Sequence, residues 1–346
     1  MTESPQNVAF DQVRLARQQA IEAFAQDYLG GPNQDLYEDM LLTTCRLARD
    51  SAGRGDVKLL AKAVAELRYA LKVFAPYKDV RKISVFGSSR TPEDHPNYLA
   101  AVEFAAAMRV AGWMCITGAG DGIMKAGHGG AGREASFGVA IRLPFEQKTN
   151  SIIANDAKLV NFRYFFTRKL MFIKEASAVA LFPGGFGTQD EGFEALTLVQ
   201  TGKAALVPIV MIEQAGGTYW PHWRRYVESE LLRNGMISEQ DMSLFAITDN
   251  VEAAVAEVTR FYRVYHSMRY VNDDLILRLE RPLSARTLDR INADFHGLLA
   301  EGDIQQVAAL PEEQGEFADK PRLKLRFDRK SAGRLRQLVN VVNEEP

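Results

Sequence analysis

The sequence predicts an α/β protein: a parallel sheet covered by helices on both faces, preceded by a helical extension and followed by a small α+β module. Two observations lead to this prediction. Between about residues 81 and 266, short apolar runs alternate with helical stretches, and three of the runs end in glycine-rich turns. Before and after this region the pattern changes. We therefore expect three domains, at residues 1–78, 79–266 and 267–346.

The N-terminal region has the pattern of several helices. It extends from about Val8 to Phe74 and is interrupted at residues 30–32 and 51–55 by glycine, proline and polar residues. Apolar residues recur at the spacing of one helix face: Leu60, Val64, Leu67 and Leu71. A linker at residues 75–79 leads into the central region.

The central region predicts strands and helices in alternation. The expected strands are Ile83–Phe86, Trp113–Thr117, Phe137–Leu143, Leu159–Phe162, Ala178–Phe182 and Leu206–Ile212. The expected helices are Tyr98–Ala111, Tyr164–Glu175, a stretch near Trp220–Arg233, and Val251–His266. Such alternation is typical of a Rossmann-like parallel sheet, in which ligands bind at the carboxyl ends of the strands.

The C-terminal region predicts a β-α-β-β-α order, which suits a small open sheet. The expected elements are Leu275–Leu279, Ala285–Leu299, Ile304–Leu310, Arg322–Phe327 and Ser331–Val342, with a mobile polar loop at Pro311–Lys320. In the strand at residues 322–327, cations alternate with apolar residues, so all three cations are expected on one face. We weigh two interpretations of this basic face: a solvated or charged edge strand, and a regulatory surface for a phosphorylated effector or a neighbouring subunit.

The composition excludes several classes of function. The 346 residues are 47% hydrophobic and 25% charged, with a net charge of −2, which gives no electrostatic reason to bind nucleic acid polymers or membranes. The two cysteines fit a reducing compartment, and the N-terminus lacks the pattern of a signal peptide, so we expect a cytoplasmic protein. The five histidines have no ligand spacing, and we expect no metal site and no cofactor.

The most informative motif is Pro183–Glu191, with the sequence PGGFGTQDE, directly after an apolar run. Its glycines, Gly184, Gly185 and Gly187, allow backbone N–H groups to converge, and Thr188 stands where a helix is expected to begin. This arrangement predicts a phosphate site with the carboxylate of Glu191 beside it. Thr188 and Glu191 also have the spacing of a capping box, which is the structural alternative.

Two further glycine-rich loops follow predicted strands. The first supplies Gly87, Ser88 and Ser89 as candidate residues of a nucleotide pocket, and the second supplies Gly118, Gly120 and Asp121. Each is weak evidence, because short glycine turns often serve geometry alone. The second loop lacks the dinucleotide fingerprint, since Ile123 stands where its last glycine is required.

A pair of cations, Arg168 and Lys169, lies on the helix that leads into the motif strand. Solvated surface cations are the structural alternative. If this helix packs beside the motif loop, Arg168 is placed to clamp a phosphate or orient a ribose, and Lys169 to line the nucleotide pocket.

These motifs together resemble the LOG family of nucleoside 5′-monophosphate phosphoribohydrolases, long mislabelled as lysine decarboxylases. The residues that carry the resemblance are PGGFGTQDE, Arg168-Lys169, the FGSS at residues 86–89 and the TGAGDGIM at residues 117–124. The resemblance covers roughly Arg81 to His266. Phe165-Phe166-Thr167 stands where cytokinin-activating members usually carry Met-His, and Met124-Lys125-Ala126 with the long flanks is more similar to larger bacterial nucleotide nucleosidases.

The resemblance implies hydrolysis of the N-glycosidic bond of a nucleoside 5′-monophosphate, such as AMP, to a free base and ribose 5-phosphate. Glu191 and Arg168 would be catalytic: the carboxylate would stabilise the sugar cation, hold a ribose hydroxyl or activate water. Family members pair through helices near the active site, so a homodimer or larger assembly is expected. The alternatives are a non-catalytic nucleotide or cofactor carrier, and a pyridoxal-phosphate decarboxylase, for which no lysine has a suitable context.

Overall fold

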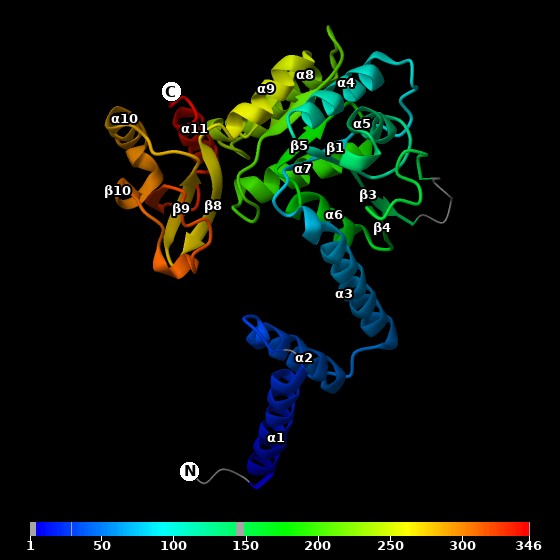
Figure 1. Cartoon of the computed structure of the whole chain (residues 1–346), viewed down its shortest axis with the longest axis vertical. Helices are drawn as coiled ribbons and strands as arrows, with labels where there is room; N and C mark the ends of the chain where they lie inside the picture. Colours follow the sequence, from blue (N-terminus) through cyan, green and yellow to red (C-terminus); the bar gives the residue numbers. More distant parts are fainter. Residues whose placement is uncertain (1–4, 29, 143–148, 346) are drawn as a thin grey trace. The chain divides into compact units, whose positions relative to one another are not determined.

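The computed structural model describes residues 5–28, 30–142 and 149–345 and divides into two compact units, Met1–Ala65 and Glu66–Pro346 (Figure 1). The domain boundaries expected after residues 78 and 266 stay predictions. None of the helices in these ranges is both long and apolar enough to span a lipid bilayer.

The N-terminal region forms three helices, interrupted where the sequence predicts. They are α1 (Pro5–Tyr28), α2 (Gln34–Arg49) and α3 (Arg54–Phe74). The last turns of α3 belong to the second unit, where Phe74 is buried and its ring stacks on Phe137 with centroids 4.3 Å apart. The Glu66 carboxylate also accepts hydrogen bonds from the backbone of Arg163 and the hydroxyl of Thr167, both at 2.9 Å. The end of α3 is therefore fixed against the sheet.

The central sheet has seven parallel strands in the order β4-β3-β2-β1-β5-β6-β7. They are β1 (Lys82–Phe86), β2 (Met114–Thr117), β3 (Ser136–Ile141), β4 (Leu159–Phe162), β5 (Ala178–Leu181), β6 (Ile209–Ile212) and β7 (Phe245–Thr248). The Rossmann-like fold is confirmed. β7 was not predicted; it is a four-residue edge strand whose side chains are only half-buried, so its apolar pattern is weak. Leu143, expected to end the third strand, lies outside the described residues.

Helices cover both faces of the sheet (Figure 1). One face carries α4 (Pro96–Val110), α5 (Ile123–Ala131) and α9 (Val251–Phe261), and the other carries α6 (Phe165–Lys174) and α7 (Phe186–Gln200). Within β1, Ile83 and Val85 join the apolar cluster under α4, while the Ser84 hydroxyl donates to Phe172 O of α6 at 2.8 Å. The strand is buried on both sides, as short apolar runs in parallel sheets are.

The remaining helical segments of this unit are short. α8 (Tyr219–Tyr226) continues as the π-helical segment η3 (Val227–Leu232), in place of the helix expected near Trp220–Arg233. Single 3₁₀ turns are η1 (Ala75–Tyr77), η2 (Arg133–Ala135), η4 (Glu239–Ser243), η5 (His296–Leu298) and η6 (Pro311–Glu313).

The C-terminal module is a four-stranded antiparallel sheet in the order β10-β11-β9-β8, with two helices. Its elements are β8 (Tyr265–Val271), β9 (Asp274–Leu279), α10 (Ala285–Phe295), β10 (Leu299–Val307), β11 (Arg322–Phe327) and α11 (Ala332–Val342). The prediction that the helix starting at Val251 extends to His266 is wrong at its C-terminal end, because α9 ends at Phe261 and β8 begins at Tyr265. The Asn343 side chain accepts from the N–H groups of Val264 and Tyr265 at 2.8 and 3.0 Å, which holds the chain in the extended path of β8.

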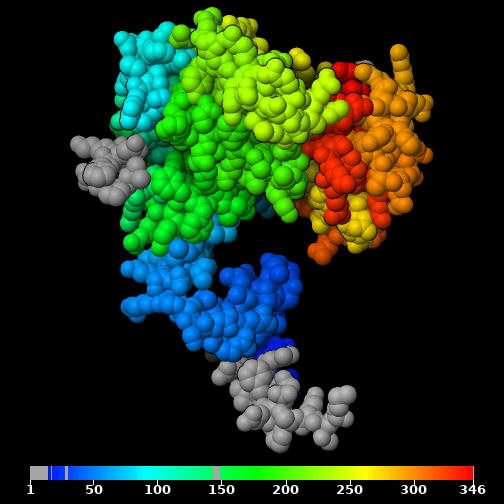
Figure 2. Space-filling model, turned by 180° about the vertical axis from the view of Figure 1, so that it is seen from behind, coloured from blue at the N-terminus to red at the C-terminus, as the bar shows by residue number. Residues whose placement is uncertain are grey.

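The module packs closely on the parallel sheet and its helices. Figure 2 shows the C-terminal segment, in red, lying between the orange part of the module and the green part of the sheet domain. At this junction Arg336 pairs with Glu257, and the Gln337 amide donates to the Ser243 hydroxyl at 2.8 Å. The apolar core is continuous across the junction.

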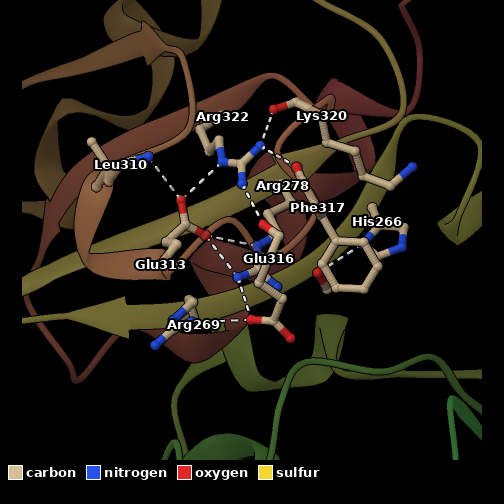
Figure 3. A network of polar contacts seen from close by, with 10 residues as sticks. His266, Arg269, Arg278, Leu310, Glu313, Glu316, Phe317, Lys320 and Arg322 are labelled. Carbon is tan, nitrogen blue, oxygen red and sulfur yellow. Dashed lines mark hydrogen bonds and ion pairs between the residues drawn. The ribbon is translucent and has the colours of Figure 1, made fainter. Parts of the chain in front are cut away.

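The segment expected as a mobile loop, Pro311–Lys320, is instead held by buried ion pairs (Figure 3). The Glu313 carboxylate is 1% exposed, lies 2.7 Å from the Arg278 guanidinium and accepts from Arg322 Nε at 2.9 Å. These cations hold the pKa of Glu313 at about 2. Arg322 Nη groups also donate to the backbone oxygens of Glu316 and Phe317 at 2.9 and 2.8 Å. This polar segment is therefore ordered, because Glu313 within it pairs with the buried cations of Arg278 and Arg322.

The interpretation of β11 as a charged edge strand is wrong, because β11 lies between β10 and β9. Of its three cations, Arg322 is fully buried, whereas the side chains of Lys324 and Arg326 are 38% and 34% exposed. Lys324 lies 3.1 Å from Asp274, and Arg326 lies 3.1 Å from Glu301. Acidic neighbours that are distant in the sequence thus neutralise the cations that the alternating pattern places together.

Candidate functional site

A cavity of about 760 Å³ opens at the carboxyl ends of β1, β2 and β5, where the three glycine-rich loops meet. Its walls come from residues 87–90 of the first loop, Gly118 of the second, Arg168 of α6 and residues 184–191 of the third loop and α7. The structure therefore brings together the motif loop, the candidate catalytic pair and the first loop, as the sequence predicts.

The first loop connects the other two. The Ser88 N–H donates to Pro183 O at 3.1 Å, and Ser88 O accepts from the N–H of Ile123 at 3.0 Å. Gly122 has φ +59°, and a Cβ there would lie 2.3 Å from Ser88 O. A glycine is thus required at residue 122 for packing between loops, rather than for a dinucleotide.

The capping-box interpretation of Thr188 is wrong. Helix α7 begins at Phe186 with Gly185 as its N-cap residue, so Thr188 is already the third helical residue. A Cβ on Gly184 would lie 2.1 Å from Thr188 Oγ1, which shows how closely the loop folds back on the helix. The first N–H groups of a helix have no partners within the helix. In α7 these groups belong to residues that line the cavity. The geometry is suited to binding an anion.

Glu191 lies on the second turn of α7 and lines the cavity. Its side chain is 6% exposed, and its Oε2 has no hydrogen-bond partner among the described atoms. Burial raises its pKa to about 7, although the nearby charges of Arg168 and Lys169 act in the opposite direction. A buried, unpaired carboxyl that titrates near neutrality is costly to stability and suits proton transfer or stabilisation of a cation.

Arg168 reaches the cavity from α6. Its Nε donates to Val139 O at 3.0 Å, and a Cβ on Gly118 would lie 2.6 Å from its Nη2. Gly118 therefore leaves the space that the guanidinium occupies. Burial lowers the pKa of Arg168, and the charge of Glu191 opposes that shift. An arginine remains cationic at neutral pH in any case.

Three of the predicted pocket residues do not line the described cavity. Lys169 forms ion pairs with Asp190 at 2.8 Å and with Glu194 at 2.9 Å. The carbonyl of Gly120 accepts from the Asn150 amide at 2.9 Å, and Asp121 is exposed. Contact of Lys169, Gly120 and Asp121 with a ligand stays a prediction.

A buried histidine behind the second loop went unnoticed in the sequence, where no spacing marks it. His128 Nε2 lies 3.1 Å from Phe137 O and 3.0 Å from Thr117 Oγ1, so Nε2 carries the proton, since a carbonyl only accepts. Its Nδ1 then accepts from the Asn150 amide at 3.1 Å. The same asparagine supports the loop carbonyl of Gly120. Burial lowers the pKa of His128, and the neutral ring supports the loop.

No side chains in the described ranges form a group of three or more His, Cys, Asp and Glu residues arranged to hold a metal ion.

A comparison with protein-family models supports part of the resemblance. A family model described as "Possible lysine decarboxylase" matches residues 120–258, which contain Arg168 and the PGGFGTQDE motif. No curated protein matches the chain.

Similar solved structures cover about half of the chain. The Moco carrier protein from Chlamydomonas reinhardtii is 20% identical, with a TM-score of 0.36, over 52% of this chain and 96% of that one. A molybdenum cofactor binding protein from Rippkaea orientalis is 16% identical, with a TM-score of 0.36, over the same shares. DNA processing protein A from Helicobacter pylori is 12% identical, with a TM-score of 0.37, over 53% and 82%.

Proposed function

We propose that this chain hydrolyses the N-glycosidic bond of a nucleoside 5′-monophosphate and releases the free base and ribose 5-phosphate. The observation that carries the proposal is the position of Glu191, whose buried carboxyl lines the cavity less than two helical turns from the start of α7. A 5′-phosphate at the helix N-terminus would place the attached ribose within reach of this carboxyl.

The proposed reaction breaks the bond between C1′ and the base nitrogen through an oxocarbenium-like transition state. A water oxygen then bonds to C1′, and the departing base takes up a proton. The Glu191 carboxylate would stabilise the positive charge on the sugar, and poor solvation strengthens that interaction. Arg168, across the cavity, would neutralise phosphate charge or orient the ribose.

The description of the matching family suggests decarboxylation of lysine, a reaction that uses a Schiff-base lysine when pyridoxal phosphate is the cofactor. None of the described residues that line the cavity is a lysine. Lys169, which follows Arg168 in the sequence, forms ion pairs with the carboxylates of Asp190 and Glu194. These contacts favour the hydrolase over the decarboxylase.

The test is incubation of the purified protein with a panel of nucleoside monophosphates, with detection of ribose 5-phosphate. Release of ribose 5-phosphate with one equivalent of base supports the proposal. The carrier alternative predicts stoichiometric binding of a nucleotide or cofactor without release of base, and that result would replace hydrolysis with binding.

A further inference from the structure

One hydroxyl outside the PGGFGTQDE motif connects both ends of the proposed phosphate loop. Tyr219, at the start of α8, donates from its hydroxyl to Gly184 O at 2.6 Å. The hydroxyl oxygen of Tyr219 in turn accepts from the Gln189 side-chain amide at 2.5 Å. Gly184 lies in the loop and Gln189 in the first turns of α7. The Tyr219 hydroxyl therefore fixes the position of the loop relative to α7, which follows it.

A buried carboxylate holds Tyr219 in place. Glu213, which follows β6, is 4% exposed and accepts from the N–H groups of Tyr219 at 3.0 Å and of Trp220 at 3.1 Å. A carboxylate in this position caps the helix and satisfies its first donors. The Trp220 indole also donates to Ile212 O at 3.0 Å. The start of α8 is therefore tied to the end of β6.

The loop needs such a restraint because glycines occupy both sides of one peptide unit. The Gly184–Gly185 peptide lacks side chains that would limit its rotation. In a trans peptide the C=O and N–H groups point in opposite directions, so holding Gly184 O also sets the direction of the Gly185 N–H. Gly185 lines the cavity and is the N-cap residue of α7. The hydroxyl thus sets the orientation of a backbone group at the anion site.

We propose that Tyr219, held by Glu213, is a positioning residue that orients the Gly184–Gly185 peptide for the 5′-phosphate of the substrate. The proposal rests on the proposed function of the same cavity. It adds a residue from α8, some thirty positions after the motif, which neither the motif nor its spacing marks.

The experiment compares the Tyr219→Phe variant with the wild type and with Tyr226→Phe, which removes a tyrosine hydroxyl from the exposed end of the same helix. Calorimetric titration with ribose 5-phosphate measures phosphate binding without turnover. We expect about tenfold weaker binding for Tyr219→Phe, as for the loss of one positioning hydrogen bond, and binding within about twofold of wild type for Tyr226→Phe. The KM for AMP should rise by a similar factor for Tyr219→Phe.

A purely structural role for Tyr219 would lower the melting temperature and leave affinity per folded molecule unchanged. Binding of ribose 5-phosphate by Tyr219→Phe within about twofold of wild type therefore overturns the proposal, whatever the melting temperature. If the wild type binds ribose 5-phosphate but releases no base, the proposed hydrolysis fails while the comparison of variants still decides the role of Tyr219. If the wild type binds no phosphorylated sugar, both proposals fail.

Discussion

Arg168 and Glu191 face one cavity from different helices, and the two side chains, both fully described, form no ion pair within 4 Å. The charge of Glu191 nevertheless acts to raise the pKa of Arg168, and the charge of Arg168 acts to lower the pKa of Glu191. Each group thus favours the charged form of the other. A closed pair would neutralise both groups and fill the space between them. Burial leaves the carboxyl of Glu191 poorly solvated, and its Oε2 has no hydrogen-bond partner among the described atoms, which suits the proposed role of stabilising a positive charge on the sugar.

Replacement of Glu191 by Gln should abolish base release while preserving the shape of the cavity. We expect a loss of at least about 100-fold in turnover, with nucleotide affinity within about tenfold of wild type. Steady-state kinetics and equilibrium titration with AMP measure the two quantities. Near wild-type turnover in this variant would show that Glu191 has no catalytic role.

The raised pKa of Glu191 makes activity and stability depend on pH in opposite ways. If the carboxylate is the active form, kcat/KM should rise with pH through about pH 7. Stability should change in the opposite direction. The folded protein retains a proton on Glu191 that the unfolded chain releases above its ordinary pKa of 4.5. The free energy of unfolding should therefore decrease as the pH rises from this value to about 7. Glu191→Gln should therefore be more stable than wild type at pH 8, by on the order of 1–3 kcal/mol.

Thermal unfolding of both proteins at pH 5 and pH 8 measures the stability difference. An equal difference at the two pH values would mean that the carboxyl titrates normally. A kcat/KM that falls through pH 7 would instead identify the protonated acid as the active form.

Gly118→Ala should disturb the site through Arg168. The added Cβ would lie 2.6 Å from Arg168 Nη2 and 2.7 Å from Met124 Sδ, so the guanidinium must move out of its position. We expect about a tenfold or greater loss of kcat/KM with the fold retained, because flexible side-chain ends yield before the backbone does. Gly129→Ala is the matched control, since its Cβ would meet only ordinary contact at 3.8 Å. Equal activity of the two variants would place Arg168 outside the mechanism.

The sequence predicts the parallel sheet and the meeting of its loops because both follow from local patterns. Apolar runs ended by glycines define β1, β2 and β5, and parallel strands bring their carboxyl ends to one edge. Contacts between distant residues escape such reasoning. Tyr219 contacts Gly184 across 35 positions in the sequence, and Arg278 pairs with Glu313 across 35 positions. Neither the restraint on the proposed phosphate loop nor the ordered segment around Glu313 therefore has a local signal in the sequence. Thr188 resembles a helix cap in the sequence because it follows the glycines and precedes Glu191 by three residues, although α7 begins at Phe186.

The phosphate should dominate substrate recognition. Without it, the donors at the start of α7 would be desolvated by the substrate and left unpaired, which costs about 1–3 kcal/mol for each buried group. AMP should therefore have a kcat/KM at least about 100-fold above that of adenosine. Rates of adenine release from the two compounds under the same conditions provide the measurement. Comparable rates would show that the PGGFGTQDE loop does not bind the phosphate.

The assembly prediction has a structural counterpart on α6, beside the cavity. Phe165, Phe166 and Leu170 are 53%, 52% and 51% exposed, and water-exposed apolar side chains of this size favour burial against a partner. We expect sedimentation at micromolar concentration to show a homodimer or a larger assembly. Phe166→Ser should weaken that assembly, whereas Tyr226→Phe, on another helix, should not. A wild-type monomer under these conditions would contradict the prediction. A dimer that persists in Phe166→Ser would place the interface elsewhere on the chain.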